Sequence, residues 1–428
     1  MEIRRLGEFI AHRKEFITIN DGIEYKRCRV QVNRRGVVLR DVVKGLEINT
    51  KRQQICKKGD FLVAEIDAKV GGYGFVPEDL VGAIVSSHYY LFEVNESLLL
   101  RDYLKVLIRT DIVQNQINSK GSTNYAAIRA GDVLNFEIPY VKIKEQKKIV
   151  ASYFLFEGKH NLITEELSAQ TNFILKLRQS VLQEAMQGKL IKQNSKGDSA
   201  RTALEKIRKE NTGKEKKTKK DKKNLPVEAD ETPFEIPRGW VWCRLGEIIE
   251  IIGGSQPPKG KFIYEEKQGY VRLVQIRDFK SDKFKTYIPK ESATRPFEKD
   301  DIMIGRYGPP VFQILRGLSG TYNVALMKAI PNPMAMIKDF CYYLLQEKRI
   351  QKIIIDDSER TAGQSGVRKP LLESIVIALP SLSEQKIIVS KVERLLKICD
   401  ELEVEITNSK KETGKLMQSV LREVFIND

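Results

Sequence analysis

The sequence is poor in the residues that most often build metal and redox sites. Its 428 residues include three histidines and five cysteines, and no cysteine lies within four positions of another. Zinc sites and redox-active thiol pairs need closely spaced cysteines or histidines, so we expect neither. Three histidines far apart in the sequence also argue against a histidine-based triad or metal site. An odd, scattered set of cysteines fits reduced thiols in the cytoplasm.

Long hydrophobic runs are also missing. No stretch of 18 apolar residues occurs, and the first eight residues carry charges where a secretory signal would be apolar. We therefore expect no membrane span and no signal peptide. The hydrophobic fraction of 41% excludes wholesale disorder, and the length predicts two or three domains.

Catalytic motifs are the third absence. There is no phosphate-binding loop of the Gly-x-x-x-x-Gly-Lys-Ser/Thr type. The tripeptide Asn332-Pro333-Met334 lacks the second proline and the aromatic residue of an amino-methyltransferase loop. Glu265-Glu266-Lys267 has no acidic partner upstream and is best read as a solvated turn. We expect no catalytic residues, no metal site and no cofactor bound by this chain itself.

What the chain does have is basic charge. It carries 73 Lys+Arg against 57 Asp+Glu, a formal charge of +16. Residues 206–223 hold ten basic and three acidic side chains, and their central part has no hydrophobic residue to bury. This segment is predicted to be a solvated linker, either a plain spacer or a direct phosphate-binding element. The basic excess points to an anionic partner, with nucleic acid as the first candidate.

The chain also repeats itself at an offset of 239 residues. Arg5-Leu6-Gly7-Glu8 recurs as Arg244-Leu245-Gly246-Glu247, and residues 145–188 match residues 384–427 at 13 of 44 positions without a gap. Chance would give about three matches, so the chain is a duplicated unit. Residues 11–138 and 250–379 look unalike, which predicts a constant frame around a divergent interior.

The repeated tail of each unit is predicted to be a helix of about 44 residues, because apolar side chains recur there with alternating steps of four and three. Neither helix can hide its apolar stripe alone, so we expect the two copies to pair. Ser383, after Pro380, is the expected N-cap of the second helix. The predicted seam consists of Ile149, Phe156, Ile163, Leu167, Leu177, Val181, Ile388, Leu395, Leu402, Ile406, Leu416 and Val420.

The remaining parts are predicted to be mixed α/β domains. Apolar segments between glycine-rich turns favour strands at 61–64, 84–85 and 89–94, and similar segments favour strands at 270–276, 302–304 and 324–327. Helical spacing of apolar residues favours helices within 98–117 and 339–355. The predicted organisation is a first domain at 1–140, a long helix at 141–192, a basic linker at 193–235, a second domain at 236–381 and a second long helix at 382–428.

Several basic and aromatic residues stand on glycine-rich loops of both domains. Arginine can read guanine, glutamine and asparagine can read adenine, and lysine holds phosphates. A single such loop is more often just a turn, but several in two related domains of a basic chain favour DNA contact. The expected DNA-binding residues are Lys69, Tyr73, Arg129, Lys259, Lys261, Arg306, Tyr307, Arg316, Tyr322, Asn323, Gln364 and Arg368.

Three stretches of the sequence resemble segments of a known protein family. They are Ile236–Gly246, which resembles a domain opening, Ser319–Ala325, and Leu379–Lys386, which resembles the start of a conserved helix. With the domain–helix–domain–helix order, they make the sequence similar to the specificity (S) subunits of type I restriction–modification systems. The first unit departs from the pattern, since it lacks the tryptophan-rich opening and has six residues from Pro139 to Glu145 where the second has four from Pro380 to Glu384.

That resemblance implies an α+β fold with a pseudo-two-fold repeat. Two target-recognition domains, separated by two long helices that form an antiparallel coiled coil, would each read half of a split, asymmetric site in double-stranded DNA. It also implies a non-catalytic cytoplasmic subunit that docks two methyltransferase subunits and the restriction subunits, which hold S-adenosylmethionine, ATP and Mg²⁺. Two alternatives stay open: a coiled-coil scaffold protein, and the specificity partner of a fused restriction–methylation enzyme.

Overall fold

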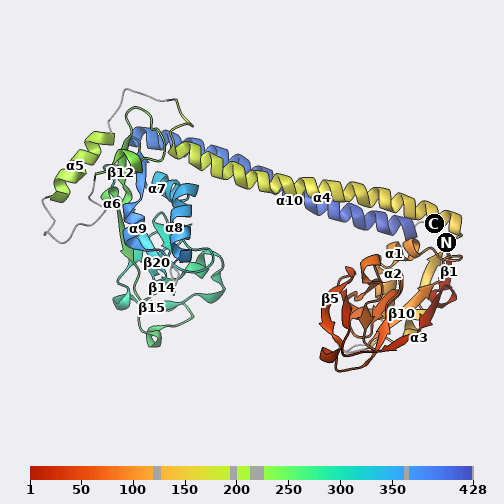
Figure 1. Ribbon diagram of the computed structural model, residues 1–428. Helices are drawn as coiled ribbons and strands as arrows, with labels where there is room; N and C mark the ends of the chain where they lie inside the picture. Colours follow the sequence, from red (N-terminus) through yellow and green to blue (C-terminus); the bar gives the residue numbers. More distant parts are fainter. Residues whose placement is uncertain (119–126, 193–199, 213–225, 361–365, 427–428) are drawn as a thin grey trace. The chain divides into compact units, whose positions relative to one another are not determined.

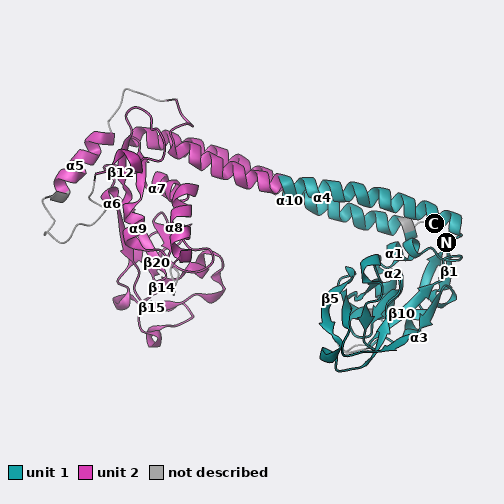
Figure 2. Cartoon of the chain, viewed as in Figure 1, with its two compact units in different colours: residues 1–169, 406–428 teal, residues 170–405 magenta. Residues whose placement is uncertain are grey.

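The chain forms two compact units. The computed structural model describes residues 1–118, 127–192, 200–212, 226–360 and 366–426 (Figure 1). The first unit contains Met1–Ala169 together with Ile406–Asp428, and the second contains Gln170–Glu405 (Figure 2). Each unit therefore combines one mixed α/β domain with segments of both long helices, so that each long helix is shared between the units.

The described residues of the first domain form three sheets. The smallest pairs β1 (Glu2–Arg5) with β11 (Glu137–Tyr140). An antiparallel sheet has the order β2 (Ile10–Arg13), β10 (Tyr89–Val94), β7 (Phe61–Ala64) and β8 (Tyr73–Phe75). The third has the order β3 (Phe16–Thr18), β6 (Arg52–Ile55), β9 (Ile84–Val85), β4 (Glu24–Gln31) and β5 (Gly36–Lys44). The domain also contains the short helices α1 (Arg101–Leu107), α2 (Asp111–Asn118) and α3 (Ala130–Leu134).

The second domain follows a related plan. Strand β12 (Val241–Arg244) pairs with β21 (Val376–Leu379). An antiparallel sheet has the order β13 (Ile249–Gly253), β20 (Leu326–Pro331), β17 (Ile302–Gly305) and β18 (Gln313–Leu315). The other sheet has the order β15 (Tyr287–Pro289), β14 (Tyr270–Val274), β19 (Gly320–Tyr322) and β16 (Pro296–Phe297). Its helices are α6 (Leu245–Ile248), α7 (Lys338–Leu345), α8 (Lys348–Arg360) and α9 (Lys369–Ser374).

The internal repeat is visible in the strand pairing. Glu2 faces Tyr140 in the first domain, and Val241 faces Leu379 in the second, so the two strand pairs have the same register at an offset of 239 residues. The antiparallel four-stranded sheets also share one strand order. The interiors are therefore more alike than their sequences suggest, and the clearest difference is the remaining sheet, which has five strands in one domain and four in the other.

The repeated Arg-Leu-Gly-Glu motif has the same structural role in both copies. The carboxylate of Glu8 accepts a hydrogen bond from the backbone N–H of Arg5 at 3.0 Å, and that of Glu247 accepts one from Arg244 at 2.8 Å. The leucine of each copy is fully buried. A Cβ added at Gly7 would lie 2.8 Å from the carbonyl oxygen of Leu134, so the glycine is needed for the close approach of α3.

The two long helices are α4 (Ile143–Met186, 44 residues) and α10 (Leu382–Ile426, 45 residues). In the first unit, Tyr153 near the start of α4 shares a hydrophobic core with Phe425 at the end of α10. In the second unit, Val181 near the end of α4 shares a core with Ile388 at the start of α10. The helices therefore run antiparallel, which confirms the predicted fold class.

The predicted seam is buried in part. Leu167, Val181, Ile388 and Ile406 are buried, and Ile149, Phe156, Leu177, Leu395 and Val420 are half-buried. Ile163, Leu402 and Leu416 are exposed, so the expectation of a continuous apolar seam is corrected at these three positions. Two paired helices cover only a narrow stripe of each other, so some side chains at the edge of the predicted stripe stay exposed.

Two local expectations differ from the structure. Helix α10 begins at Leu382, and the residue before it, Ser381, is its N-cap. The hydroxyl of Ser381 accepts a hydrogen bond from the backbone N–H of Glu384 at 3.3 Å. The expectation that Ser383 is the N-cap is therefore corrected. The predicted linker contains helix α5 (Ala200–Thr212), which buries Leu204 and Ile207 in the core of the second unit. The lysine-rich residues 213–225 lie outside the described residues.

Candidate nucleic-acid interface

The hairpin between β4 and β5 ends in an arginine-rich tip. Asn33 and Arg34 both have positive φ angles, 59° and 60°, which are costly for residues other than glycine. The tip is held by two backbone hydrogen bonds, from the N–H of Asn33 to the carbonyl of Val70 at 2.6 Å and from that of Arg34 to Gly71 at 2.9 Å. The hairpin tip therefore packs against the glycine-rich loop that begins at Lys69.

This tip forms one wall of a groove between the first domain and the long helices. The groove has a volume of about 1090 Å³ and is lined by the hairpin tip, Lys69, the junction of α1 and α2, and residues of α4 and α10. We call it the first groove. Its basic side chains are Arg34, Arg35, Lys69, Arg109 and Arg422.

The acidic side chains of the first groove are engaged by arginines. Asp111 accepts a hydrogen bond from Arg34 at 2.7 Å, and Glu157 forms an ion pair with Arg109. Arg109 also donates to the hydroxyl of Tyr153 at 2.8 Å. Five basic groups thus face two carboxylates, and the groove carries a positive excess suited to an anionic backbone.

The second unit contains an equivalent groove. It has a volume of about 560 Å³ and is lined by α8, by the loop before β18 and by Gln179 of α4. Gln179 corresponds in the repeat to Gln418, which lines the first groove, and α8 corresponds to α2. Lys348 and Lys352 are the basic residues of this second groove. The repeat therefore creates two related grooves with different linings.

Several residues expected to bind DNA lie at the surface of the domains. Arg129, Lys259 and Lys261 are exposed, and Lys69, Arg306 and Tyr307 are half-buried. The guanidinium of Arg306 lies 5.0 Å from the centre of the Tyr307 ring, and the backbone carbonyl of Arg306 accepts a hydrogen bond from Val367. These six residues remain candidates for contacts with DNA.

Other expected residues are committed to the fold. Tyr73 is 1% exposed and its hydroxyl donates to Gln114, while Tyr322 is 1% exposed and its hydroxyl donates to the carbonyl of Ile252. Burial raises the pKa of each hydroxyl to about 12. The expectation that these two tyrosines touch DNA is therefore corrected, because their side chains fill the interior of the domains.

Three more expected residues have partners within the second domain. Arg316 donates to Asp339 at 2.7 Å and lies over the ring of Tyr342, and Arg368 is paired with Asp357 at 2.7 Å. The side-chain oxygen of Asn323 accepts a hydrogen bond from the N–H of Ala325 and so closes a turn. Gln364 lies outside the described residues.

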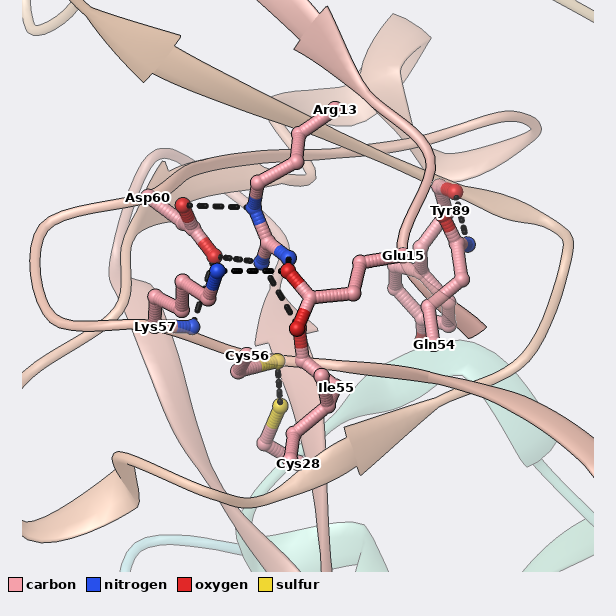
Figure 3. A network of polar contacts seen from close by, with 9 residues as sticks. All are labelled: Arg13, Glu15, Cys28, Gln54, Ile55, Cys56, Lys57, Asp60 and Tyr89. Carbon is pink, nitrogen blue, oxygen red and sulfur yellow. Dashed lines mark hydrogen bonds and ion pairs between the residues drawn. The ribbon is translucent and has the colours of Figure 1, made fainter. Parts of the chain in front are cut away.

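A polar network stiffens the first domain beneath its surface loops (Figure 3). Arg13 pairs with the buried carboxylate of Asp60 and donates to the carbonyl of Ile55 at 2.7 Å. Asp60 also accepts a hydrogen bond from the backbone N–H of Lys57 at 2.7 Å. Because an isolated buried charge is costly, these reciprocal contacts hold the strand ends in one arrangement.

The sequence interpretation missed the hairpin tip, Arg109 and Arg422. The tip has a local signal, since Asn33-Arg34-Arg35-Gly36 separates two strand-like segments and places two arginines on a turn. Arg109 and Arg422 have no such local signal, because they reach the first groove only once α10 packs beside the first domain.

Among the described residues, no group of three or more His, Cys, Asp or Glu side chains could hold a metal ion. In the same part of the chain, no helix is long and apolar enough to cross a membrane.

Comparison with known proteins gives the chain a family. The profile of the type I restriction modification DNA specificity domain matches residues 1–170 and again 237–410. The chain is 27% identical to the specificity subunit of the type I restriction enzyme EcoEI of Escherichia coli, over 59% of the chain and 45% of the relative. For the EcoAI subunit of the same organism the identity is 28%, over 59% and 44%. The chain thus spans less than half of the length of these two relatives.

Solved structures share the fold. A chain from a study of complex assembly and conformational transition of the type I R-M system superposes with a TM-score of 0.72, at 20% identity and over 100% of this chain and 98% of that one. The HsdS subunit of Thermoanaerobacter tengcongensis gives a TM-score of 0.56, at 21% identity and over 100% and 97%. With the family profile matched twice across the two repeated units, the chain belongs to the type I restriction modification DNA specificity domain family.

Proposed function

We propose that this chain is the DNA-specificity subunit of a type I restriction–modification complex and reads a bipartite, asymmetric DNA site. The observation that carries the proposal is the duplicated frame. Two domains with the same strand pairing and the same register present different loops and differently lined grooves. Such a pair of domains is suited to two unlike half-sites within one target.

The first groove is the proposed contact with the DNA backbone. Its arginines come from the hairpin tip, the α1–α2 junction and α10. Contacts of this kind fix the position of a protein on DNA, while loops that reach base edges select the sequence. Arg129, Lys259, Lys261, Arg306 and Tyr307 are the proposed base- or phosphate-contacting residues of the two domains.

The long helices have a proposed double role. They set the separation of the two half-sites, and they dock methyltransferase subunits, two of which would complete the complex. Apolar side chains that stay exposed on the helices support the docking role; they include Leu155 and Phe173 on α4 and Val404 on α10. Apolar surface of this kind is typical of protein interfaces.

The chemistry would belong to partner subunits in the cytoplasm. Methyltransferase subunits would bind S-adenosylmethionine, and restriction subunits would use ATP and Mg²⁺. This chain would supply recognition and assembly without a catalytic step of its own.

Selection of DNA from a random library tests the proposal. The full chain, alone and with a co-expressed methyltransferase subunit, should enrich two short specified segments separated by an unspecified gap. Affinity for that site should fall steeply with salt yet exceed affinity for scrambled DNA. Enrichment of no sequence would identify a scaffold and overturn the proposal.

A further inference from the structure

Each long helix begins with a buried glutamine at the same position of the repeat. Gln146 and Gln385 are 239 residues apart and both are fully buried, although each stands in a charged segment, Glu-Gln-Lys. A buried amide is stabilising only when its hydrogen bonds are made, so the partners of these two side chains show what each glutamine does.

The two amides make the same three hydrogen bonds. The side-chain NH₂ of Gln146 donates to the carbonyls of Leu98 at 3.0 Å and Val141 at 2.8 Å, and its oxygen accepts from the N–H of Leu100 at 2.7 Å. All three bonds would be lost if the amide were turned over, so its orientation is fixed by its partners.

Gln385 repeats this pattern in the second unit. Its NH₂ donates to the carbonyls of Ala335 at 2.6 Å and Pro380 at 3.0 Å, and its oxygen accepts from the N–H of Ile337 at 2.9 Å. The same arrangement thus survives in two domains whose interior sequences have diverged.

The partners lie at two places in each domain, the start of a helix and the end of a strand. Leu100 is the N-cap residue of α1, and Ile337 is the N-cap residue of α7; neither has a side-chain cap of its own. Val141 and Pro380 each follow the last strand of a domain directly. Each glutamine therefore ties the first residues of its long helix to a domain helix and to the end of a domain strand.

The tie spans a short joint. Strand β11 ends at Tyr140 and α4 begins at Ile143, and the same two-residue interval separates β21 from α10. The two residues of each joint can rotate about their backbone bonds, apart from the fixed φ of Pro380, and the hydrophobic core that each domain shares with its long helix is not directional. Without directional contacts, such a joint allows a domain to rock on its helix. A domain of this size has a radius of roughly 19 Å, so a 10° rocking about the joint at its edge would move its far surface by about 7 Å and its centre by about 3 Å. The movement of the centre is close to the rise of one base pair, about 3.4 Å.

We propose that Gln146 and Gln385 are positioning residues that lock each recognition domain onto its long helix and so restrict the chain to one gap between half-sites. This inference rests on the proposed function for its effect on DNA. The locking itself is a property of the chain and can be measured without DNA.

The test uses the full chain with Gln146→Leu, which keeps the side-chain volume but makes none of the three bonds. Gln146→Glu is the second variant, because it keeps the acceptor for Leu100 and turns an oxygen toward two carbonyls. The control is Lys147→Leu at the neighbouring exposed position. Gln385→Leu repeats the experiment in the second unit.

The first measurement is selection among DNA molecules with fixed half-sites and gaps varied from three base pairs shorter to three longer. At equal folded fraction by circular dichroism, we expect the preference of the chain for its own gap over neighbouring gaps to fall at least tenfold in the glutamine variants, with the selected bases unchanged. The control should keep the full preference. A folded glutamine variant with unchanged gap preference, or one that loses base selectivity instead, would overturn the proposal.

The second measurement is the distance distribution between spin labels at Lys159→Cys on α4 and Leu46→Cys on the first domain, both exposed positions. The distribution should broaden by about 3 Å or more in Gln146→Leu and Gln146→Glu but not in Lys147→Leu. If the unaltered chain selects no bipartite site but the distance distribution broadens in the glutamine variants, the proposed function is wrong. In that case the positioning role of the two glutamines is still supported. An unchanged distribution in both glutamine variants refutes the lock.

Discussion

If the paired helices set the gap between half-sites, lengthening both by one heptad should change that gap by a calculable amount. The perturbation is a second copy of residues 168–174 in α4 and of residues 400–406 in α10. Each copied segment ends on a buried isoleucine, Ile174 or Ile406, so the seven-residue period of the buried stripe is kept. The antiparallel ion pair of Arg178 with Glu403, at 3.0 Å, places the two insertions at neighbouring levels.

The size of the change follows from helix geometry. Seven residues at 1.5 Å each add about 10.5 Å, which corresponds to about three base pairs of DNA. Three base pairs also turn the second half-site through about 100° around the duplex axis, so affinity should fall at the new gap. Three heptads add about 31 Å, close to one full DNA turn of about 34 Å, and should restore both phase and affinity.

Selection from DNA with variable gaps is the assay. We expect the same two half-site sequences, a gap about three base pairs longer for one heptad, and a gap longer by about nine base pairs with near-normal affinity for three. An insertion in α4 alone is the control, because it breaks the pairing and should reduce binding at every gap. A selected gap that stays the same after the paired insertion would refute the spacing role of the helices.

Three further predictions concern single residues. Arg35 and Arg422 line the first groove, and replacing either with alanine should weaken DNA binding about 3- to 10-fold. Fluorescence anisotropy at several salt concentrations should show the slope of log K against log salt lowered by about one. An unchanged slope would exclude phosphate contact by that arginine. Ile207→Ala should destabilise the second unit by about 2–4 kcal/mol in urea unfolding, since Ile207 is 2% exposed in its core, whereas the exposed Glu205→Ala should have little effect. An unaffected Ile207→Ala would mean that α5 is a spacer.

The third concerns Asp301: burial alone would raise the pKa of its carboxyl group, but hydrogen bonds from Lys328, from the backbone N–H of Glu298 and from Lys338 lower it to about 2, from 3.8. Stability from these contacts is present above pH 4 and lost as the pH falls through 2, so Asp301→Asn should cost on the order of 1–2 kcal/mol at pH 7 and progressively less towards pH 2. A cost that does not depend on pH would contradict this assignment.

The architecture could be predicted from the sequence because its signals are local and repeated. The offset of 239 residues located the duplicated frame, and the apolar period located both long helices. The predicted strands at 61–64, 84–85 and 89–94 coincide with β7, β9 and β10. Strands β7 and β9 are short apolar runs that are buried throughout, and each lies between two other strands of its sheet, where such runs are expected.

The candidate site was less predictable. Tyr73 and Tyr322 stand on glycine-rich segments that look like surface loops, yet tertiary packing buries both rings. Arg316 and Arg368 were correctly placed on polar loops, but the carboxylates that pair with them are 23 and 11 residues away. The first groove depends on α10 packing beside a domain about 300 residues earlier in the chain, which no local pattern encodes.

Helix α5 shows how charge can mask a structural segment. Its residues are mostly charged or polar, and it is followed by a lysine-rich segment. The composition of the two together predicts a solvated linker, although α5 contains a few apolar side chains. Leu204 and Ile207 nevertheless stand three residues apart on one helical face and are buried in the core of the second unit. Helical spacing of two or three apolar residues can therefore anchor a segment that composition alone assigns to a linker.

The proposed function is tested most directly by sequencing the DNA that the intact chain, with the proposed methyltransferase partner, selects from a fully random library. We expect one asymmetric motif with two specified segments and a gap of fixed length. One continuous motif, two segments at freely varying gaps, or no motif at all would contradict it.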